Sequence, residues 1–268
     1  MIFIDTHTHL DGEEYAADRD EVVARAKAAG VAMVFIPAIS TDNIPAVLDT
    51  CRRYPDFAKP MIGIHPEEVR ADYEQQIAKA KTMMTPEVIA IGEVGLDFYW
   101  SREYEQEQLK AFEMQVQWAV EAHLPLMIHC RKAQQEMVAI LKRYEADLVG
   151  GVFHCFTGNE QEAAQLLRFN RFALGIGGVL TFKKSKLPDV VKDIPLSRIV
   201  LETDSPYMAP VPKRGERNES AYVEHVLHKM ALCHGKSADE VAHITTHTAL
   251  SIFTKAADRM SNPYMSNQ

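Results

Sequence analysis

Short runs of apolar residues alternate along the chain with longer segments in which apolar residues recur at helical spacing. Each short run is rich in Val, Ile and Leu, as expected for a strand buried on both faces. The pattern predicts eight strands, at residues 2–4, 32–38, 61–65, 88–92, 126–129, 151–154, 172–175 and 199–202.

The intervening segments predict helices at 19–29, 44–54, 67–83, 103–122, 134–144, 161–169, 186–192, 221–233 and 239–257. Strands that alternate with helices are typical of a parallel sheet. Eight such units over this length predict an α/β protein with a single (β/α)8 TIM barrel. We expect the barrel domain to span residues 1–260 and residues 261–268 to form a flexible C-terminal tail.

The bulk composition is that of a globular protein with a substantial core. Of the 268 residues, 47% are hydrophobic and 25% are charged, which is ordinary for such a domain. The formal net charge of −8 argues against a general nucleic-acid coat. It does not exclude a nucleotide substrate, because bound divalent cations and a few local arginines can supply a positive field.

Compartment signals favour a cytoplasmic protein. No apolar run approaches the roughly 20 residues that a membrane span needs, and residues 1–20 lack the pattern of a secretion signal. The cysteines are far apart and include no CxxC pair, which is typical of a reduced protein; they are Cys51, Cys130, Cys155 and Cys233.

Polar side chains gather at the predicted carboxyl ends of the strands, beginning with His7 and His9. Residues two apart in an extended chain point to the same side, so these imidazoles project together. Alone, such a pair is as easily two polar loop residues as half of a metal site. Later strand ends add His65, Glu93, His129, His154 and Asp204. Because these ends share one rim in a closed parallel barrel, the set predicts a metal centre.

The ligand types suit Zn²⁺ or Mn²⁺, with Mg²⁺ less natural beside so many imidazole nitrogens. They are also more numerous than one tetrahedral zinc ion uses. We therefore expect divalent metal cations, two per chain, with Glu93 placed to bridge them. Paired ions about 3.5–4 Å apart can activate a water and stabilise a leaving oxygen.

Six motifs carry a resemblance to a known family. They are IDTHTHLD at 4–11, GIHPE at 63–67, IGEVGLDFYW at 91–100, IHCRKA at 128–133, GVFHCFTGN at 151–159 and LETDSPYMAPVPKRGERNESAYV at 201–223. With them the sequence resembles the TatD family of metal-dependent hydrolases, deoxyribonucleases within the amidohydrolase superfamily. The resemblance implies a TIM barrel and hydrolysis of phosphodiester bonds in DNA, often from an end. It also implies the metal ligands His7, His9, Glu93, His129, His154 and Asp204.

Four further residues are predicted to contact the substrate. His65 is expected to contact a phosphate, although a polar cap before Pro66 would explain it too. Arg131 lies two residues beyond His129 and is expected to bind a phosphate, with a rim salt bridge as the alternative. Arg217 and Asn218 belong to a basic loop after the eighth strand, where this fold often binds phosphate; otherwise the loop is simply solvated.

Two other pairs have competing interpretations. Tyr99 and Trp100 follow the motif of the fourth strand and could stack on a base or pack under their loop. Cys130 and Cys155 could be zinc thiolates, but each follows a histidine of the set, so strand alternation predicts that they face the helices as core residues.

The expected reaction is attack of a metal-activated water on a phosphodiester, with Glu93 and Asp204 as catalytic residues and Asp204 as general base. The expected partner is DNA or another phosphodiester substrate, with no membrane and no obligatory protein partner. One alternative is a related hydrolase of amides, lactones or small phosphoesters. Those enzymes often bridge their metals with a carboxylated lysine, where this chain has Glu93. The other is a metal-binding protein without turnover.

Overall fold

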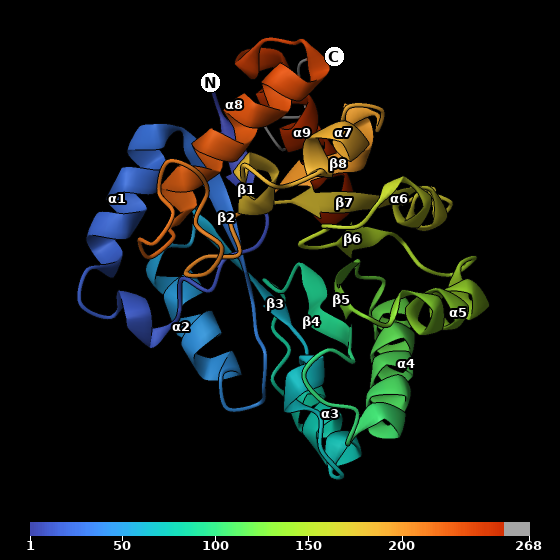
Figure 1. Cartoon of the computed structure of the whole chain (residues 1–268). Coiled ribbons are helices and arrows are strands. Elements are labelled where there is room, and N and C mark those ends of the chain that lie inside the picture. Colours follow the sequence, from blue (N-terminus) through green and yellow to red (C-terminus); the bar gives the residue numbers. More distant parts are fainter. Residues whose placement is uncertain (255–268) are drawn as a thin grey trace.

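Eight parallel strands, each paired with the next in chain order, surround the centre of the molecule (Figure 1). The computed structural model describes residues 1–254. The strands are β1 (Phe3–Asp5), β2 (Val31–Pro37), β3 (Ala58–Ile62), β4 (Ala90–Asp97), β5 (Leu126–Arg131), β6 (Gly151–Phe153), β7 (Phe172–Ile176) and β8 (Ile199–Leu201).

The helices lie outside the strands, and all but the last of them follow one another around the barrel in chain order (Figure 1). They are α1 (Arg19–Ala29), α2 (Ile44–Arg53), α3 (Tyr73–Thr82), α4 (Glu105–Ala122), α5 (Gln134–Tyr144), α6 (Glu160–Leu166), α7 (Leu187–Val191), α8 (Val223–His234) and α9 (Ala238–Phe253). The TIM-barrel fold predicted from the sequence is confirmed.

The first and last strands meet just beyond the end of β1. The backbone N–H of Thr6 donates to the carbonyl of Leu201 at 3.0 Å. A parallel bridge then joins Thr8 to Ser205. The seam that closes the barrel therefore runs directly beside His7 and Asp204.

Each strand sends one apolar side chain into the barrel, and together these fill it as a packed core. The residues are Ile4, Phe35, Met61, Ala90, Met127, Val152, Ala173 and Val200. Helix α9 packs against this layer; the Phe253 and Phe35 ring centroids are 4.9 Å apart. Thr246 of α9 donates to the carbonyl of Ile2, ahead of β1. Helix α9 therefore covers the amino-terminal end of the barrel, opposite the predicted metal ligands.

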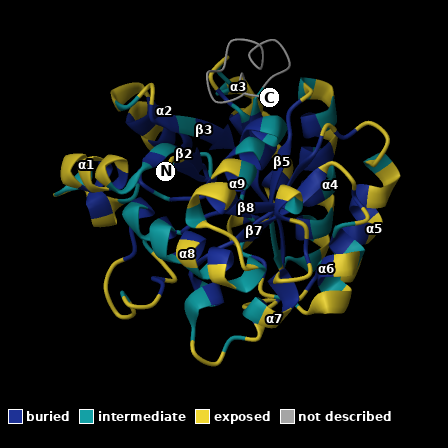
Figure 2. Ribbon diagram, turned by 90° about the horizontal axis from the view of Figure 1, so that it is seen from above, coloured by how far each residue is buried: buried dark blue, intermediate teal, exposed yellow. Residues whose placement is uncertain are grey.

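The alternate side chains of each strand point outward and pack beneath the helices. Leu126 and Ile128 of β5 are fully buried there, on either side of the inward-facing Met127. The strands are accordingly buried on both faces, while exposed residues lie on the outer surfaces of the helices and on loops (Figure 2). Among residues 1–254, no helix is long and apolar enough to cross a membrane.

Element boundaries differ from the predictions where glycine or proline interrupts the pattern. Strand β3 begins at Ala58, ahead of Lys59 and Pro60, and ends at Ile62, so residues 63–65 of the predicted strand lie beyond it. Strand β4 continues to Asp97, through glycines that are more typical of a loop in the sequence. The predicted helix 67–83 is wrong before Tyr73, where a short 3-10 turn (Pro66–Glu68) precedes α3. The predicted tail at 261–268 and the end of the last helix lie outside the described residues.

Candidate metal centre

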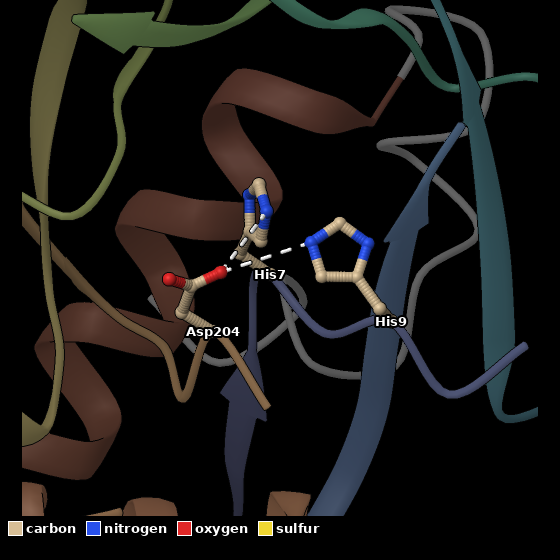
Figure 3. Close-up of side chains that lie close together, drawn as sticks. All are labelled: His7, His9 and Asp204. Atoms are coloured by element: carbon tan, nitrogen blue, oxygen red, sulfur yellow. Dashed lines mark ion pairs between the residues drawn. The ribbon is translucent and has the colours of Figure 1, made fainter. Parts of the chain in front are cut away.

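The Glu93 carboxylate lies between two groups of histidines. Its Oε2 atom is 3.2 Å from His7 Nε2 and 3.8 Å from His9 Nε2. Asp204 Oδ1 completes this side at 3.7 Å from each of the same two nitrogens (Figure 3). Two histidines that follow β1, one acid of β4 and one acid that follows β8 thus converge on one small volume, next to the seam of the barrel.

The other oxygen of Glu93 faces a second group. Its Oε1 atom is 2.7 Å from His154 Nε2 and 3.1 Å from His129 Nδ1. His65 Nε2 lies 3.3 Å away. All the residues predicted to ligate metal are therefore brought together, with one carboxylate oxygen directed to each group.

Close packing of β4 on β5 sets this geometry. Gly95 has a φ of +149°, and a Cβ atom there would collide with the carbonyl of His129. Only glycine adopts such a backbone freely. The close approach holds Glu93 on β4 beside His129 on β5.

His129 has its ring orientation set by Asp97, at the end of β4. His129 Nε2 lies 2.9 Å from Asp97 Oδ2. A ring nitrogen that donates to a carboxylate carries the proton, so the lone pair of the neutral ring is on Nδ1, which faces Glu93. Burial raises the pKa of Asp97, but the hydrogen bond from His129 outweighs it, and the net pKa is lowered. Asp97 was not predicted as a site residue.

His65 has the opposite arrangement. Its Nδ1 accepts the backbone N–H of Glu67 at 3.1 Å. In the neutral ring the proton is then on Nε2, the nitrogen that faces Glu93. His65 is accordingly a hydrogen-bond donor toward the centre, which suits a phosphate oxygen better than a cation.

Two residues that sequence analysis did not single out support the seam side of the site. Asp5 accepts from the hydroxyl of Thr203 at 2.6 Å and from its backbone N–H at 2.9 Å. The backbone N–H of Asp204 donates to the carbonyl of His7 at 2.9 Å. Burial raises the pKa of Asp5 to about 6. This network fixes Asp204, in a left-handed conformation with φ +55°, opposite His7.

Glu202 is the other unpredicted acid, and it is fully buried behind His154. Its Oε1 is 3.8 Å from His154 Nδ1 and accepts the backbone N–H of Cys155. Burial raises the pKa of Glu202 to about 8. The sequence contained a signal for both acids, because Asp5 and Glu202 lie two residues before His7 and Asp204, the same spacing that separates His7 from His9.

The charges of the centre are strongly coupled. Burial is the main reason that the pKa of His7 falls to about 4, so its imidazole is neutral near pH 7. Burial also opposes ionisation of Glu93, but its charge interactions, first with His154 and then with His65 and His7, hold its pKa well below the usual range. Burial disfavours charge on His154, and Glu93 overcomes this effect and raises the pKa of His154 to about 10.

Several buried polar atoms here have no hydrogen-bond partner among the described residues. They are both ring nitrogens of His7, Nδ1 of His154 and Oε2 of Glu202. Such atoms are costly to bury, and three of them are on imidazoles, which bind divalent metals well. Three sets of side chains have ligand atoms close enough to hold an ion: His7, His9 and Asp204; His7, His154 and Glu202; and His65, Glu93 and His129. The residues present thus fit divalent cations.

The profile of the TatD related DNase family matches residues 4–254 of this chain. The chain belongs to the TatD family. The resemblance inferred from the six motifs is confirmed, and with it the class of metal-dependent hydrolases.

Two relatives and one solved structure place this TatD protein more closely. It is 40% identical over 255 residues to the uncharacterized metal-dependent hydrolase YabD of Bacillus subtilis, covering 94% of this chain and 99% of that protein. It is 34% identical over 259 residues to the 3'-5' ssDNA/RNA exonuclease TatD of Salmonella typhimurium, covering 93% and 98%. The crystal structure of the TatD homologue YJJV from Escherichia coli superposes with a TM-score of 0.87, at 28% identity, covering 94% and 98%.

Arg131 of this TatD chain is exposed at the end of β5, and its guanidinium stacks on Tyr99, with Cζ 3.6 Å from the ring centroid. It makes no ion pair with any described residue. The alternative of a rim salt bridge is therefore wrong for residues 1–254. The predicted phosphate contact remains compatible with these free N–H donors.

Arg217 and Asn218 are engaged within the protein. Arg217 pairs with Asp18 at 2.6 Å and lies over the ring of Tyr15. Asn218 is fully buried, and its amide donates to the carbonyls of Thr203 and Tyr207. The direct contact with a DNA backbone expected of Asn218 is therefore corrected: its side chain holds the loop after β8 and has no exposed surface.

The cysteines divide between two settings. Cys130 packs against the core between strands and helices, as predicted. Strand β6 ends at Phe153, and Cys155 has a φ of +49°, so strand alternation does not apply to it. Burial and the nearby carboxylates raise the pKa of Cys155 far above its usual value, which keeps it a neutral thiol.

Proposed function

We propose that this protein is a divalent-metal-dependent exonuclease that hydrolyses phosphodiester bonds of single-stranded nucleic acid. DNA is its primary substrate in this proposal. One observation carries the proposal: Glu93 directs one carboxylate oxygen toward His7 and His9 and the other toward His129 and His154. That division is suited to two neighbouring cations. The name of the Salmonella relative, an exonuclease for single-stranded DNA and RNA, supports the choice of substrate.

We assign one cation to His7, His9, Glu93 and Asp204, and the second to Glu93, His129 and His154. The mixture of imidazole and carboxylate favours Zn²⁺ or Mn²⁺ over Mg²⁺. When bound, such ions lower the pKa of a coordinated water and neutralise charge on a phosphate.

The side chains around the ions supply the remaining steps. The Asp204 carboxylate is 18% exposed and lies at the edge of the first group, so it can accept the proton of the attacking water. The His65 Nε2–H can donate to a phosphate oxygen. Arg131, with its unpaired guanidinium, can bind the same or the adjoining phosphate.

We also infer that the protein works in a reducing compartment, the cytoplasm. The four cysteines at 51, 130, 155 and 233 are all free. Disulfides are rare in that environment.

The proposal is tested with end-labelled oligonucleotides. The metal-free protein is titrated separately with Zn²⁺, Mn²⁺ and Mg²⁺, and products are resolved by length. We expect stepwise shortening of single strands that chelation abolishes and a divalent cation restores. Hydrolysis of an amide or lactone with no activity on oligonucleotides would favour the related hydrolases, and stoichiometric metal binding without any turnover would favour a binding protein.

A further inference from the structure

An aromatic and cationic cluster lies beside the metal centre, and its two aromatic side chains have no role in the reaction as described above. Tyr99 and Trp100 follow β4, and the two residues are 50% and 65% exposed. The ring centroids are 4.8 Å apart in an edge-to-face arrangement. The sequence left open whether these rings pack under their loop; the exposed fractions show that they do not.

Arg131 joins the two rings. Its Cζ atom lies 3.6 Å from the Tyr99 centroid and 5.1 Å from the Trp100 centroid, so the guanidinium lies in the angle between them. Stacking of this kind orders an arginine while leaving its N–H donors available. Since Arg131 covers Tyr99 closely, the indole of Trp100 offers the larger open surface.

Two short connections link the cluster to the predicted metal ligand His129. The backbone N–H of Tyr99 donates to Asp97 Oδ1 at 2.8 Å, and the other oxygen of Asp97 accepts from His129. Arg131 follows His129 by two residues on β5, which is about 7 Å along a strand. That distance is comparable with one step between successive phosphates in an extended single strand.

We propose that Trp100, Tyr99 and Arg131 form a nucleotide subsite, in which Arg131 binds the phosphate next to the scissile one and Trp100 stacks on the attached base. This inference rests on the proposed function. It adds that the enzyme recognises an unpaired base in addition to phosphate. Duplexes are disfavoured because their bases present no free face, whereas every unpaired base can stack regardless of its identity. Trp100 is thus a specificity residue, and Arg131 positions the strand.

The test observes Trp100 directly. The chain has two tryptophans, and Trp118 is 95% buried in α4. A Trp118→Phe variant therefore leaves Trp100 as the single reporter. The probes are a phosphorothioate oligonucleotide that resists hydrolysis and a matched strand whose sugars carry no bases. We expect the normal strand to quench Trp100 emission and the abasic strand to leave it unchanged at saturation. Equal quenching by both, or none by either, would overturn the subsite.

Kinetics provide the second measurement. Trp100→Ala should lower kcat/KM for a normal oligonucleotide about 5- to 100-fold, the range expected for loss of one stacked base. Trp100→Phe should recover most of the loss. With a substrate lacking the base at the stacked position, the wild type should already be impaired and Trp100→Ala should add little. Leu232→Ala, an exposed apolar residue of α8, is the matched surface control.

The two proposals fail in different ways. Base-dependent quenching without hydrolysis would retain the subsite and reject the exonuclease. The opposite outcome is metal-dependent hydrolysis in which Trp100→Ala and removal of the base lower kcat/KM independently of each other. That outcome would retain the exonuclease and reject the subsite.

Discussion

The carboxylate of Asp97 accepts a hydrogen bond from Nε2 of His129 at 2.9 Å, and this contact determines which ring nitrogen can bind metal. With the proton on Nε2, the lone pair of Nδ1 faces Glu93 at 3.1 Å. Partners of this kind raise ligand basicity and fix the ring. Asp97 is therefore part of the metal centre even though it touches no other ligand of the set.

Replacing Asp97 by Asn should weaken metal binding about 10- to 100-fold, as is usual for such supporting carboxylates. The amide keeps the shape and loses the charge that holds the His129 proton. Competition with a chromophoric chelator measures the affinity, and circular dichroism checks that the barrel is intact. An unchanged affinity in a folded variant would remove Asp97 from the centre.

Glu93→Gln and Asp204→Asn should respond differently to added metal. Losing the charge of Glu93 removes an anion from both proposed cation positions, so occupancy should fall and excess cation should restore part of the activity. Asp204→Asn cannot accept a proton, so kcat should fall roughly 10²- to 10⁴-fold and recover little. Activity is measured across a metal titration. If excess metal rescues both variants equally, Asp204 is only a ligand and another group takes the proton.

Metal uptake should release protons, because Glu93 raises the pKa of His154 to about 10 against the effect of burial. At pH 8 this imidazole is protonated in the metal-free protein, and it must become neutral to bind a cation. Affinity should therefore rise with pH up to about 10. Calorimetry in buffers of different ionisation enthalpy counts the protons. His228→Gln, which changes an exposed histidine of α8, should release the same number as the wild type, whereas buffer-independent heats would contradict the assignment.

Substrate binding by the Arg131→Ala and Arg217→Ala variants should depend differently on salt concentration. Arg131 has no ion pair among residues 1–254, so Arg131→Ala should raise KM. It should also reduce the slope of log binding affinity against log salt concentration by about 0.7, the value for one phosphate contact on a single strand. Arg217 is already paired with Asp18, so Arg217→Ala should leave the slope unchanged and lower stability by up to about 1 kcal/mol. A reduced slope for Arg217→Ala would reinstate the substrate contact expected from the sequence.

The sequence predicts the barrel and the convergence of the site well because both depend on strand periodicity. Residues at successive strand ends must meet in a closed barrel, and Glu93 and His154 do so at 2.7 Å. Asp97 was not predicted as a site residue because the glycines that precede it make the sequence at the end of β4 resemble a loop. The behaviour of Asn218 depends on tertiary contacts to Thr203 and Tyr207, which local pattern does not encode.

Crystals of the metal-free protein soaked in Mn²⁺ give the most direct test of the central claim, because anomalous scattering locates each ion independently of activity. We expect two peaks on opposite sides of the Glu93 carboxylate, one within ligand distance of His7 and His9 and the other within ligand distance of His129 and His154. A single peak, or peaks that do not share Glu93, would contradict the bridged two-cation centre.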